Sequence, residues 1–142
     1  MTDQPVILIT GVAGYWGGRL AERLALTSQP ADAPVLLGLD SEPPAKPLAG
    51  LDFIQADVRN PLLVDLLRSE RIDTLVHLAL RENYRSSERA FDLNVIGTMK
   101  VLAAAAEAGV RKVILRSSTM VYGALPTNPA FLAEDQPLNG GK

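Results

Sequence analysis

The sequence of 142 residues predicts an α/β fold in which one doubly wound parallel sheet has the strand order 3-2-1-4-5. Three observations lead to this prediction. Short apolar runs alternate with amphipathic runs along the chain. The first apolar run, VILIT (6–10), is apolar on both faces, as a strand covered by helices on each side should be. A glycine-rich corner follows that run directly, at the place where such sheets bind ligands.

Strands and helices are expected to alternate, which requires parallel pairing through right-handed crossovers. The predicted strands cover residues 6–10, 34–40, 51–57, 73–80 and 112–118, and the predicted helices cover residues 15–28, 61–70 and about 87–108. A proline-rich loop separates the second and third strands. The chain beyond residue 118 is rich in proline and glycine, so it is expected to be loop.

The helices are predicted from the spacing of apolar residues and from residues typical of helix ends. Leu20 and Leu24 recur at helical spacing in the first helix. Asn60 and Pro61 are typical of a helix start, and Gly109 stands where a C-terminal cap is usual. The third helix carries five apolar residues on one face, namely Phe91, Val95, Met99, Leu102 and Ala106.

The composition argues against several classes of function. A formal net charge of −2 provides no basic surface for nucleic acid or an anionic membrane. No run approaches the roughly 20 apolar residues of a membrane span. The sequence contains no cysteine and one histidine, so neither a thiolate nor a histidine metal site is expected. A chain without cysteine is typical of the cytoplasm.

The glycine corner consists of Gly11, Gly14 and Gly17, directly after the first strand and at the start of a helix. The first glycine permits a tight turn, the second permits close approach of a diphosphate, and the third permits close packing of helix and strand. The helix start offers unpaired N–H groups and a partial positive charge to the anion. The pattern therefore predicts dinucleotide binding, although three glycines can also serve tight packing alone.

Asp40 stands at the end of the second strand, 23 residues after Gly17. A carboxylate there can accept hydrogen bonds from the hydroxyl groups of the adenosine ribose, and it would repel a 2′-phosphate. The next residues, Ser41 and Glu42, bring no compensating positive charge. NAD is therefore favoured over NADP. The alternative is a solvated aspartate that starts a loop.

Asp57 ends the third strand and is followed by Val58. A carboxylate at this place can accept a hydrogen bond from the adenine amino group while Val58 packs on the ring. An aspartate in a loop is more often a turn former, so the residues alone leave both interpretations open.

Six motifs stand in a specific order and spacing over nearly the whole chain. They are TGVAGYWGG (10–18), LD (39–40), ADVRN (56–60), HLA (77–79), NVIGT (94–98) and SSTMVYG (117–123). In these motifs the sequence resembles the extended short-chain dehydrogenase/reductases, particularly the NAD-dependent sugar-nucleotide epimerase/dehydratase group. The resemblance implies a Rossmann-type fold, NAD as cofactor, and a nucleotide sugar or other small carbonyl or hydroxyl compound as substrate. In the full-length form it also implies a homodimer, paired through the third helix and the helix after the Tyr-x-x-x-Lys motif of the family.

The resemblance also implies cofactor contacts that the residues alone do not indicate. Leu78, Ala79 and Leu80 would neighbour the cofactor, the backbone of Tyr15 and Trp16 would lie at the diphosphate, Ser117 would lie by the nicotinamide, and Asp57 and Val58 would contact the adenine. Two of these positions depart from the family pattern. Trp16 replaces a small aliphatic residue, so the indole must find room or a polar partner, and Leu80 replaces a residue that is commonly small.

Two residues are implied as catalytic. Ser118, four residues before Tyr122, matches the serine that hydrogen-bonds the substrate, and the alternative for the serine pair is simple loop capping. Asn94 lies inside the third helix, where asparagine is a poor helix former, so a specific hydrogen bond is expected there. The family uses that asparagine at its active site. The single histidine, His77, is expected to be structural rather than a general base.

The proton-transfer pair of the family, Tyr-x-x-x-Lys, is not found. The residues four positions after the three tyrosines are Arg19, Glu88 and Pro126. The chain is therefore expected to be an NAD-binding domain (1–142), cut off before the catalytic pair and the substrate domain, and by itself inactive. A non-catalytic NAD-binding or sensing module and a reductase of a non-sugar carbonyl are the alternatives.

Overall fold

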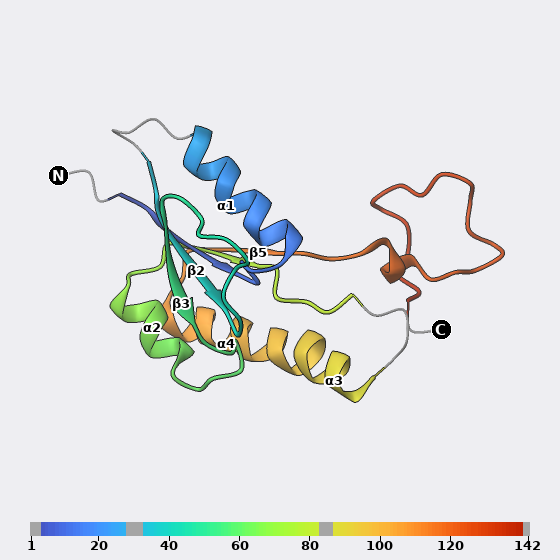
Figure 1. Ribbon diagram of the computed structural model, residues 1–142. Helices are drawn as coiled ribbons and strands as arrows, with labels where there is room; N and C mark the ends of the chain where they lie inside the picture. Colours follow the sequence, from blue (N-terminus) through green and yellow to red (C-terminus); the bar gives the residue numbers. More distant parts are fainter. Residues whose placement is uncertain (1–3, 28–32, 83–86, 141–142) are drawn as a thin grey trace.

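The five strands form one parallel sheet of order β3-β2-β1-β4-β5, which confirms the predicted topology (Figure 1). The computed structural model describes residues 4–27, 33–82 and 87–140. The strands are β1 (Val6–Thr10), β2 (Val35–Asp40), β3 (Leu51–Gln55), β4 (Thr74–His77) and β5 (Lys112–Leu115). Because β1 lies between β2 and β4, the crevice above its carboxyl end is the switch point at which such sheets bind ligands.

Helices cover both faces of the sheet, and each face has its own core. Figure 1 shows α1 (Tyr15–Thr27) on one side and α2 (Leu63–Ser69) with α4 (Thr98–Ala108) on the other. Successive strand residues point to opposite faces. Ile9 therefore packs with Ala21 of α1, whereas Leu8 packs with Val101 of α4. All four of these side chains are buried, which explains why VILIT is apolar throughout.

Several predicted elements are longer than the observed ones. The predicted strands over 51–57, 73–80 and 112–118 end at Gln55, His77 and Leu115. The first residue after each strand still donates one backbone hydrogen bond to the neighbouring strand, and the residues beyond line the crevice. The second helix begins at Leu63 rather than 61. Asn60 nevertheless acts at its start, since its side-chain oxygen accepts a hydrogen bond from Leu62 N–H at 2.9 Å. Residue 28 of the first predicted helix lies outside the described residues.

The predicted third helix is one continuous helical segment of three parts. These parts are α3 (Glu88–Phe91), the π-helical turn η1 (Asp92–Gly97) and α4. Gly109 ends it in the left-handed conformation at φ 76°, as predicted. The five apolar residues predicted to share a face form an exposed stripe rather than the packing face. The packing face consists of smaller residues, Ala90, Gly97, Val101 and Ala105.

The far edge of the sheet is open. Every residue of β5 is exposed, including Val113, Ile114 and Leu115, as expected for an edge strand without a covering element. A 3₁₀ turn, η2 (Thr119–Tyr122), follows, and the described chain from 123 to 140 contains neither helix nor strand. This agrees with the predicted loop, although Gly141 lies outside the described residues. Among the described helices, none is long and apolar enough to cross a membrane.

Candidate functional site

The glycine corner is tightly packed at two of its three glycines. Gly11 has φ +75°, and a Cβ on it would lie 2.6 Å from the backbone nitrogen of Ala79. A Cβ on Gly17 would lie 2.2 Å from the carbonyl oxygen of Gly11, so α1 approaches β1 closely enough to exclude any side chain. A Cβ on Gly14 would be 3.3 Å from the same oxygen, and Gly14 is exposed at the crevice. The first and third glycines are therefore needed by the fold, and the second keeps the crevice accessible.

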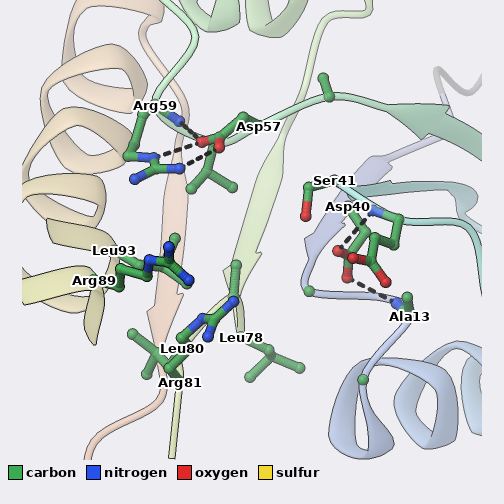
Figure 2. A pocket seen from close by; sticks show the side chains of 16 residues that line it. Ala13, Asp40, Ser41, Asp57, Arg59, Leu78, Leu80, Arg81, Arg89 and Leu93 are labelled. Carbon is green, nitrogen blue, oxygen red and sulfur yellow. Dashed lines mark hydrogen bonds and ion pairs between the residues drawn. The ribbon is translucent and has the colours of Figure 1, made fainter. Parts of the chain in front are cut away.

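Asp40 lies across from the glycine corner and helps to hold it. Its Oδ2 accepts a hydrogen bond from Ala13 N–H at 3.0 Å, and its Oδ1 accepts a longer one from Glu42 N–H at 3.4 Å (Figure 2). Both residues line, with Asp40, a cavity of about 620 Å³. A carboxylate oxygen can accept more than one hydrogen bond, so Asp40 retains capacity for a ligand hydroxyl group.

Asp57 is held on the other wall of the same cavity. Its carboxylate accepts hydrogen bonds from the backbone N–H and the guanidinium group of Arg59 (Figure 2). The guanidinium group of Arg59 also pairs with Asp92 of η1. The hydrogen bond from the Arg59 side chain lowers the pKa of Asp57. Val58 lines the cavity, but it is only 4% exposed because it packs in the core beneath α4. We define the Asp40 half of the crevice as Asp40, Asp57, Val58 and Arg59.

The residues after β4 form the floor between the two walls. Leu78, Ala79 and Leu80 are half-buried and line the cavity together with Gly11, and their contact with a cofactor stays a prediction. Thr10 fixes this floor, since its hydroxyl oxygen accepts hydrogen bonds from Leu78 N–H at 3.2 Å and Ala79 N–H at 3.4 Å.

His77 lies beneath this floor, where it is completely buried. The Thr10 hydroxyl accepts from backbone amides, so its own proton is donated to Nδ1 of His77 at 2.7 Å, and Nε2–H then donates to the Thr98 hydroxyl at 3.0 Å. Burial lowers the pKa of His77 to about 4. A neutral histidine with both ring nitrogens bonded to hydroxyl groups joins β1, β4 and α4, in agreement with the structural role predicted for it.

A second cavity, at the end of β5, contains Asn94 and Ser118, the two residues implied as catalytic. We define the serine half as Asn94, Thr98, Ser117, Ser118 and Met120, which line one cavity with the end of β5. Both serines are exposed. The hydroxyl oxygen of Ser118 accepts a hydrogen bond from Met120 N–H at 3.2 Å, so this serine caps the turn η2. Capping was the alternative interpretation of the serine pair, and it does not prevent the hydroxyl proton from reaching a ligand.

Asn94 makes the specific hydrogen bonds that its place in a helix predicted. Its side chain accepts from Arg81 N–H at 2.8 Å and donates to Arg81 C=O at 2.8 Å, so both polar groups of the amide engage one backbone unit. This pair of bonds fixes the chain after β4 against η1. Asn94 therefore positions the rim between the two cavities, and its direct role toward a substrate stays a prediction.

Sequence reasoning missed several charged residues of the crevice. Arg59, Arg81 and Arg89 line the first cavity (Figure 2), and Glu82 with Arg116 lines the space next to the glycine corner. Arg59 had a signal, because an arginine two residues after a turn aspartate can fold back on it. The others come from segments far apart in the sequence and had none. Within residues 4–27, 33–82 and 87–140, no group of three or more acidic, histidine or cysteine side chains is arranged to hold a metal ion.

Comparison with known sequences decides the family. The sequence model of the "NAD dependent epimerase/dehydratase family" matches residues 7–140. The chain belongs to this family. The glycine corner, Asp40 and the serine half of the crevice are thus features of a family member, and this family is NAD-dependent.

The chain spans less than half the length of the first relatives that it matches. An uncharacterized protein of Mycobacterium tuberculosis is 34% identical over 138 residues, which is 92% of this chain and 36% of that protein. A UDP-glucose 4-epimerase of Mycolicibacterium smegmatis is 36% identical over 145 residues, 93% of this chain and 44% of the relative. The solved structure of MoeE5 in complex with UDP-glucose and NAD superposes with a TM-score of 0.78 at 29% identity, over 94% of this chain and 42% of that one.

Proposed function

We propose that the crevice binds NAD and that the chain is the cofactor-binding part of an oxidoreductase of the epimerase/dehydratase type that acts on a sugar nucleotide. The observation that carries the proposal is the pairing of the glycine corner with Asp40. The carboxylate touches the backbone of the corner at Ala13 and faces the same cavity, so the parts that would receive a diphosphate and a ribose are adjacent. The residues present fit the cofactor.

The proposed cofactor contacts follow the two walls and the floor. Backbone N–H groups at Tyr15 and Trp16 would receive the diphosphate, where the start of α1 adds a favourable field. Asp40 would accept from the ribose, and its charge would disfavour a 2′-phosphate. Asp57 and Val58 would face the adenine, although burial of Val58 leaves only its edge for the ring. Leu78, Ala79 and Leu80 would form the floor, with Gly11, Gly14 and Gly17 keeping the corner free of side chains.

The serine half would face the reacting end. NAD supplies a hydride acceptor when it is bound. Ser118 would donate its hydroxyl proton to a substrate oxygen, Ser117 would lie by the nicotinamide, and Asn94 would keep the rim after β4 in place. The sugar-nucleotide substrate rests on the names of relatives, which include UDP-glucose 4-epimerases. We place the Tyr-x-x-x-Lys pair and the substrate domain in sequence beyond this chain.

A second function is favoured by one observation, namely that no tyrosine in the sequence has a lysine four residues later. In this alternative the chain binds NAD as a module and catalyses nothing. The two proposals agree on the Asp40 half and differ only in the serine half. We further propose that two full-length copies pair in the cytoplasm, with the exposed apolar stripe of α3, η1 and α4 in their interface. Phe91 and Met99 are 59% and 62% exposed there.

Calorimetric titration with NAD and NADP tests the binding proposal. The unmodified chain should bind NAD more tightly than NADP. Asp40→Ala should lower the affinity for NAD by roughly tenfold, which is the scale of one charge-assisted hydrogen bond. It should also reduce the ratio between the affinities for NAD and NADP. Asp52→Ala on β3 is the matched control, because it removes one exposed carboxylate outside the cavity linings. Equal affinities for NAD and NADP in the unmodified chain would contradict the role of Asp40.

A further inference from the structure

Trp16, at the start of α1, and Arg116, which the sequence did not point to, are in contact next to the glycine corner. The guanidinium carbon of Arg116, just after β5, lies 5.7 Å from the ring centroid of Trp16, within the range of a cation–π contact. Trp16 also packs edge-to-face on Tyr15 at 5.2 Å. Trp16, which replaces a small aliphatic residue of the family pattern, is 55% exposed, so its indole has room at the surface and contacts Arg116 through the ring.

Arg116 has a second partner. Its guanidinium group donates to the carboxylate of Glu82 in an ion pair. The two side chains differ in exposure, at 28% for Arg116 and 63% for Glu82. The backbone N–H of Arg116 also donates to His77 C=O at 3.3 Å, which continues the β4–β5 ladder. Arg116 is therefore held by the sheet and by Trp16, whereas Glu82 is the more exposed and more easily released partner.

The ion pair stands at the junction of two cavities. One cavity is lined by the glycine corner, Tyr15, Trp16 and the floor after β4. The other is the cavity of the serine half. Leu80, Glu82 and Arg116 line both. A dinucleotide that extends from the glycine corner to the serines must therefore pass this pair of charges.

The charges of Arg116 and Glu82 determine which part of a dinucleotide binds next to them. Among the described residues that line the cavity at the glycine corner, Arg116 carries the single positive charge and Glu82 the single negative charge. A diphosphate competes with Glu82 for the guanidinium group and is repelled by the carboxylate. The oxidised nicotinamide ring is itself cationic, so Arg116 complements the diphosphate and not the ring. Release of Glu82 into water costs little because exposed ion pairs are weak.

We propose that Arg116 is a diphosphate-binding residue, stacked in place by Trp16 and occupied by Glu82 until a dinucleotide displaces that carboxylate. The inference rests on the proposed binding of NAD and adds to it a specific residue outside the glycine corner. Glu82 thereby lowers the affinity of the crevice for the cofactor, and Arg116 raises it.

Calorimetric titration of the chain with NAD, ADP-ribose and adenosine tests this proposal. Arg116→Met should lower the affinity for NAD and for ADP-ribose by roughly tenfold or more, because both ligands carry the diphosphate. The affinity for adenosine, which has no diphosphate, should stay unchanged. Glu82→Gln should strengthen NAD and ADP-ribose by about threefold to fivefold. The double variant should bind like Arg116→Met alone, since Glu82 acts only through Arg116. Quenching of Trp16, the one tryptophan of the sequence, gives a second measure of the same binding.

Matched controls come from a similar ion pair away from the crevice. Arg68 and Glu107 pair at 3.1 Å on exposed surfaces of α2 and α4. Arg68→Met and Glu107→Gln make the same charge changes and should leave all three affinities unchanged.

The outcomes separate the two proposals. If the unmodified chain binds neither NAD nor ADP-ribose, the proposed function fails and the role of Arg116 fails with it. Two results would overturn only the role of Arg116. The first is that NAD binds and Glu82→Gln does not raise its affinity. The second is that Arg116→Met lowers the affinity for adenosine as much as the affinity for ADP-ribose. Thermal melting of each variant without ligand shows whether a loss of binding is a loss of folding. Because Glu82 is largely exposed, its variant keeps the test decisive if Arg116→Met fails to fold.

Discussion

The two halves of the crevice differ in how completely this chain builds them. In the Asp40 half each acidic side chain has a fixed partner, the Ala13 amide for Asp40 and Arg59 for Asp57. In the serine half Ser118 caps its own turn, and the adjoining strand β5 is exposed along its whole length. The first half follows β2 and the edge strand β3, which is partly buried, whereas the second adjoins the opposite edge strand, β5, which is exposed.

This difference separates binding from catalysis. Most groups proposed to hold NAD come from the ends of β1, β2, β3 and β4, which support one another through the ladder, and Arg116 after β5 is added to them by the further proposal. The groups proposed to act on a substrate follow the exposed edge strand β5, in the case of the two serines, or stand on η1, in the case of Asn94. An NAD-binding module would therefore need only groups that this chain already holds in place. An enzyme would also need a proton-transfer pair at the serine half.

The largest expected effect is at the glycine corner, on which both halves depend. Gly17→Ala should lower the free energy of unfolding by about 4 kcal/mol or more, because its Cβ would lie 2.2 Å from a backbone oxygen that cannot move away. Urea denaturation followed by circular dichroism measures this loss.

Gly18→Ala, one residue along the same helix, is the control for that substitution. A Cβ there meets only Val12 C=O at 3.5 Å, an ordinary contact. Alanine should therefore stabilise the helix by up to about 1 kcal/mol. Similar losses in the two variants would show that the close approach of α1 and β1 is not what Gly17 serves.

The next effect concerns His77, which lies beneath the floor between the halves. Its pKa is about 4 in the folded chain and about 6.5 when unfolded, so between these values the unfolded state binds the proton and the folded state does not. Stability is full above pH 6.5 and should fall by about 3 kcal/mol as the pH decreases to 4. Asp57 and Asp73 have lowered pKa values, so their contributions are lost only below pH 3.8.

Urea denaturation at several pH values between 4 and 7 checks this prediction, and His77→Gln should remove most of the slope. The single histidine also gives one pair of ring signals in proton NMR. Titration of those signals near pH 6.5 in the folded chain would refute the burial account.

A smaller effect is expected from the Arg59 pair in the Asp40 half. Arg59→Met should lower stability by about 1 kcal/mol, because it releases β3 from η1 and the pair is partly screened by water. It should also weaken adenosine binding by about threefold through a less ordered Asp57. Arg68→Met at the exposed pair with Glu107 should cost less than half as much stability. Calorimetry with adenosine and thermal melting provide both values, and an unchanged adenosine affinity would remove Asp57 from the site.

The smallest effect sharpens the contrast between the halves. Ser118→Ala should lower stability by about 0.5 kcal/mol, the lower range for loss of a cap, and should change NAD affinity by less than about twofold. Calorimetry with NAD measures the affinity. A tenfold loss would mean that the serine half contributes to cofactor binding and that the two halves are not separate.

The sequence was sufficient to predict the sheet order and the place of Asp40 beside the glycine corner, whereas Arg59 in the same half of the crevice was missed. VILIT predicts a buried strand, the glycine spacing predicts the turn into α1, and the aspartate at the end of the second strand predicts the ribose side of the crevice. Each pattern needs only a few neighbouring residues. The π-helical turn η1 was not predicted, since one turn of i→i+5 hydrogen bonds is too short to be recognised from the spacing of apolar residues. The partners of Asn94 and Trp16 also could not be foreseen, because Arg81 and Arg116 reach them only through tertiary packing.

The exposed stripe on α3, η1 and α4 shows a different limit. Spacing placed Phe91, Val95 and Met99 on one face, and this is correct. Spacing cannot tell which face meets the sheet when small residues form the other. Ala105 and Val101 pack there because the helix lies close to the strands, whereas the larger side chains remain available for another surface.

Amide NMR spectra of the ¹⁵N-labelled chain, recorded during titration with NAD, test the central claim most directly. The account predicts that saturation shifts the amide signals of Ala13 to Gly17 and of Asp57 and Val58, because the glycine corner and the Asp40 half receive the cofactor. Signals of the loop from 124 to 140 should move little. No shifts at the glycine corner at saturating NAD, or the largest shifts in that loop, would contradict the account.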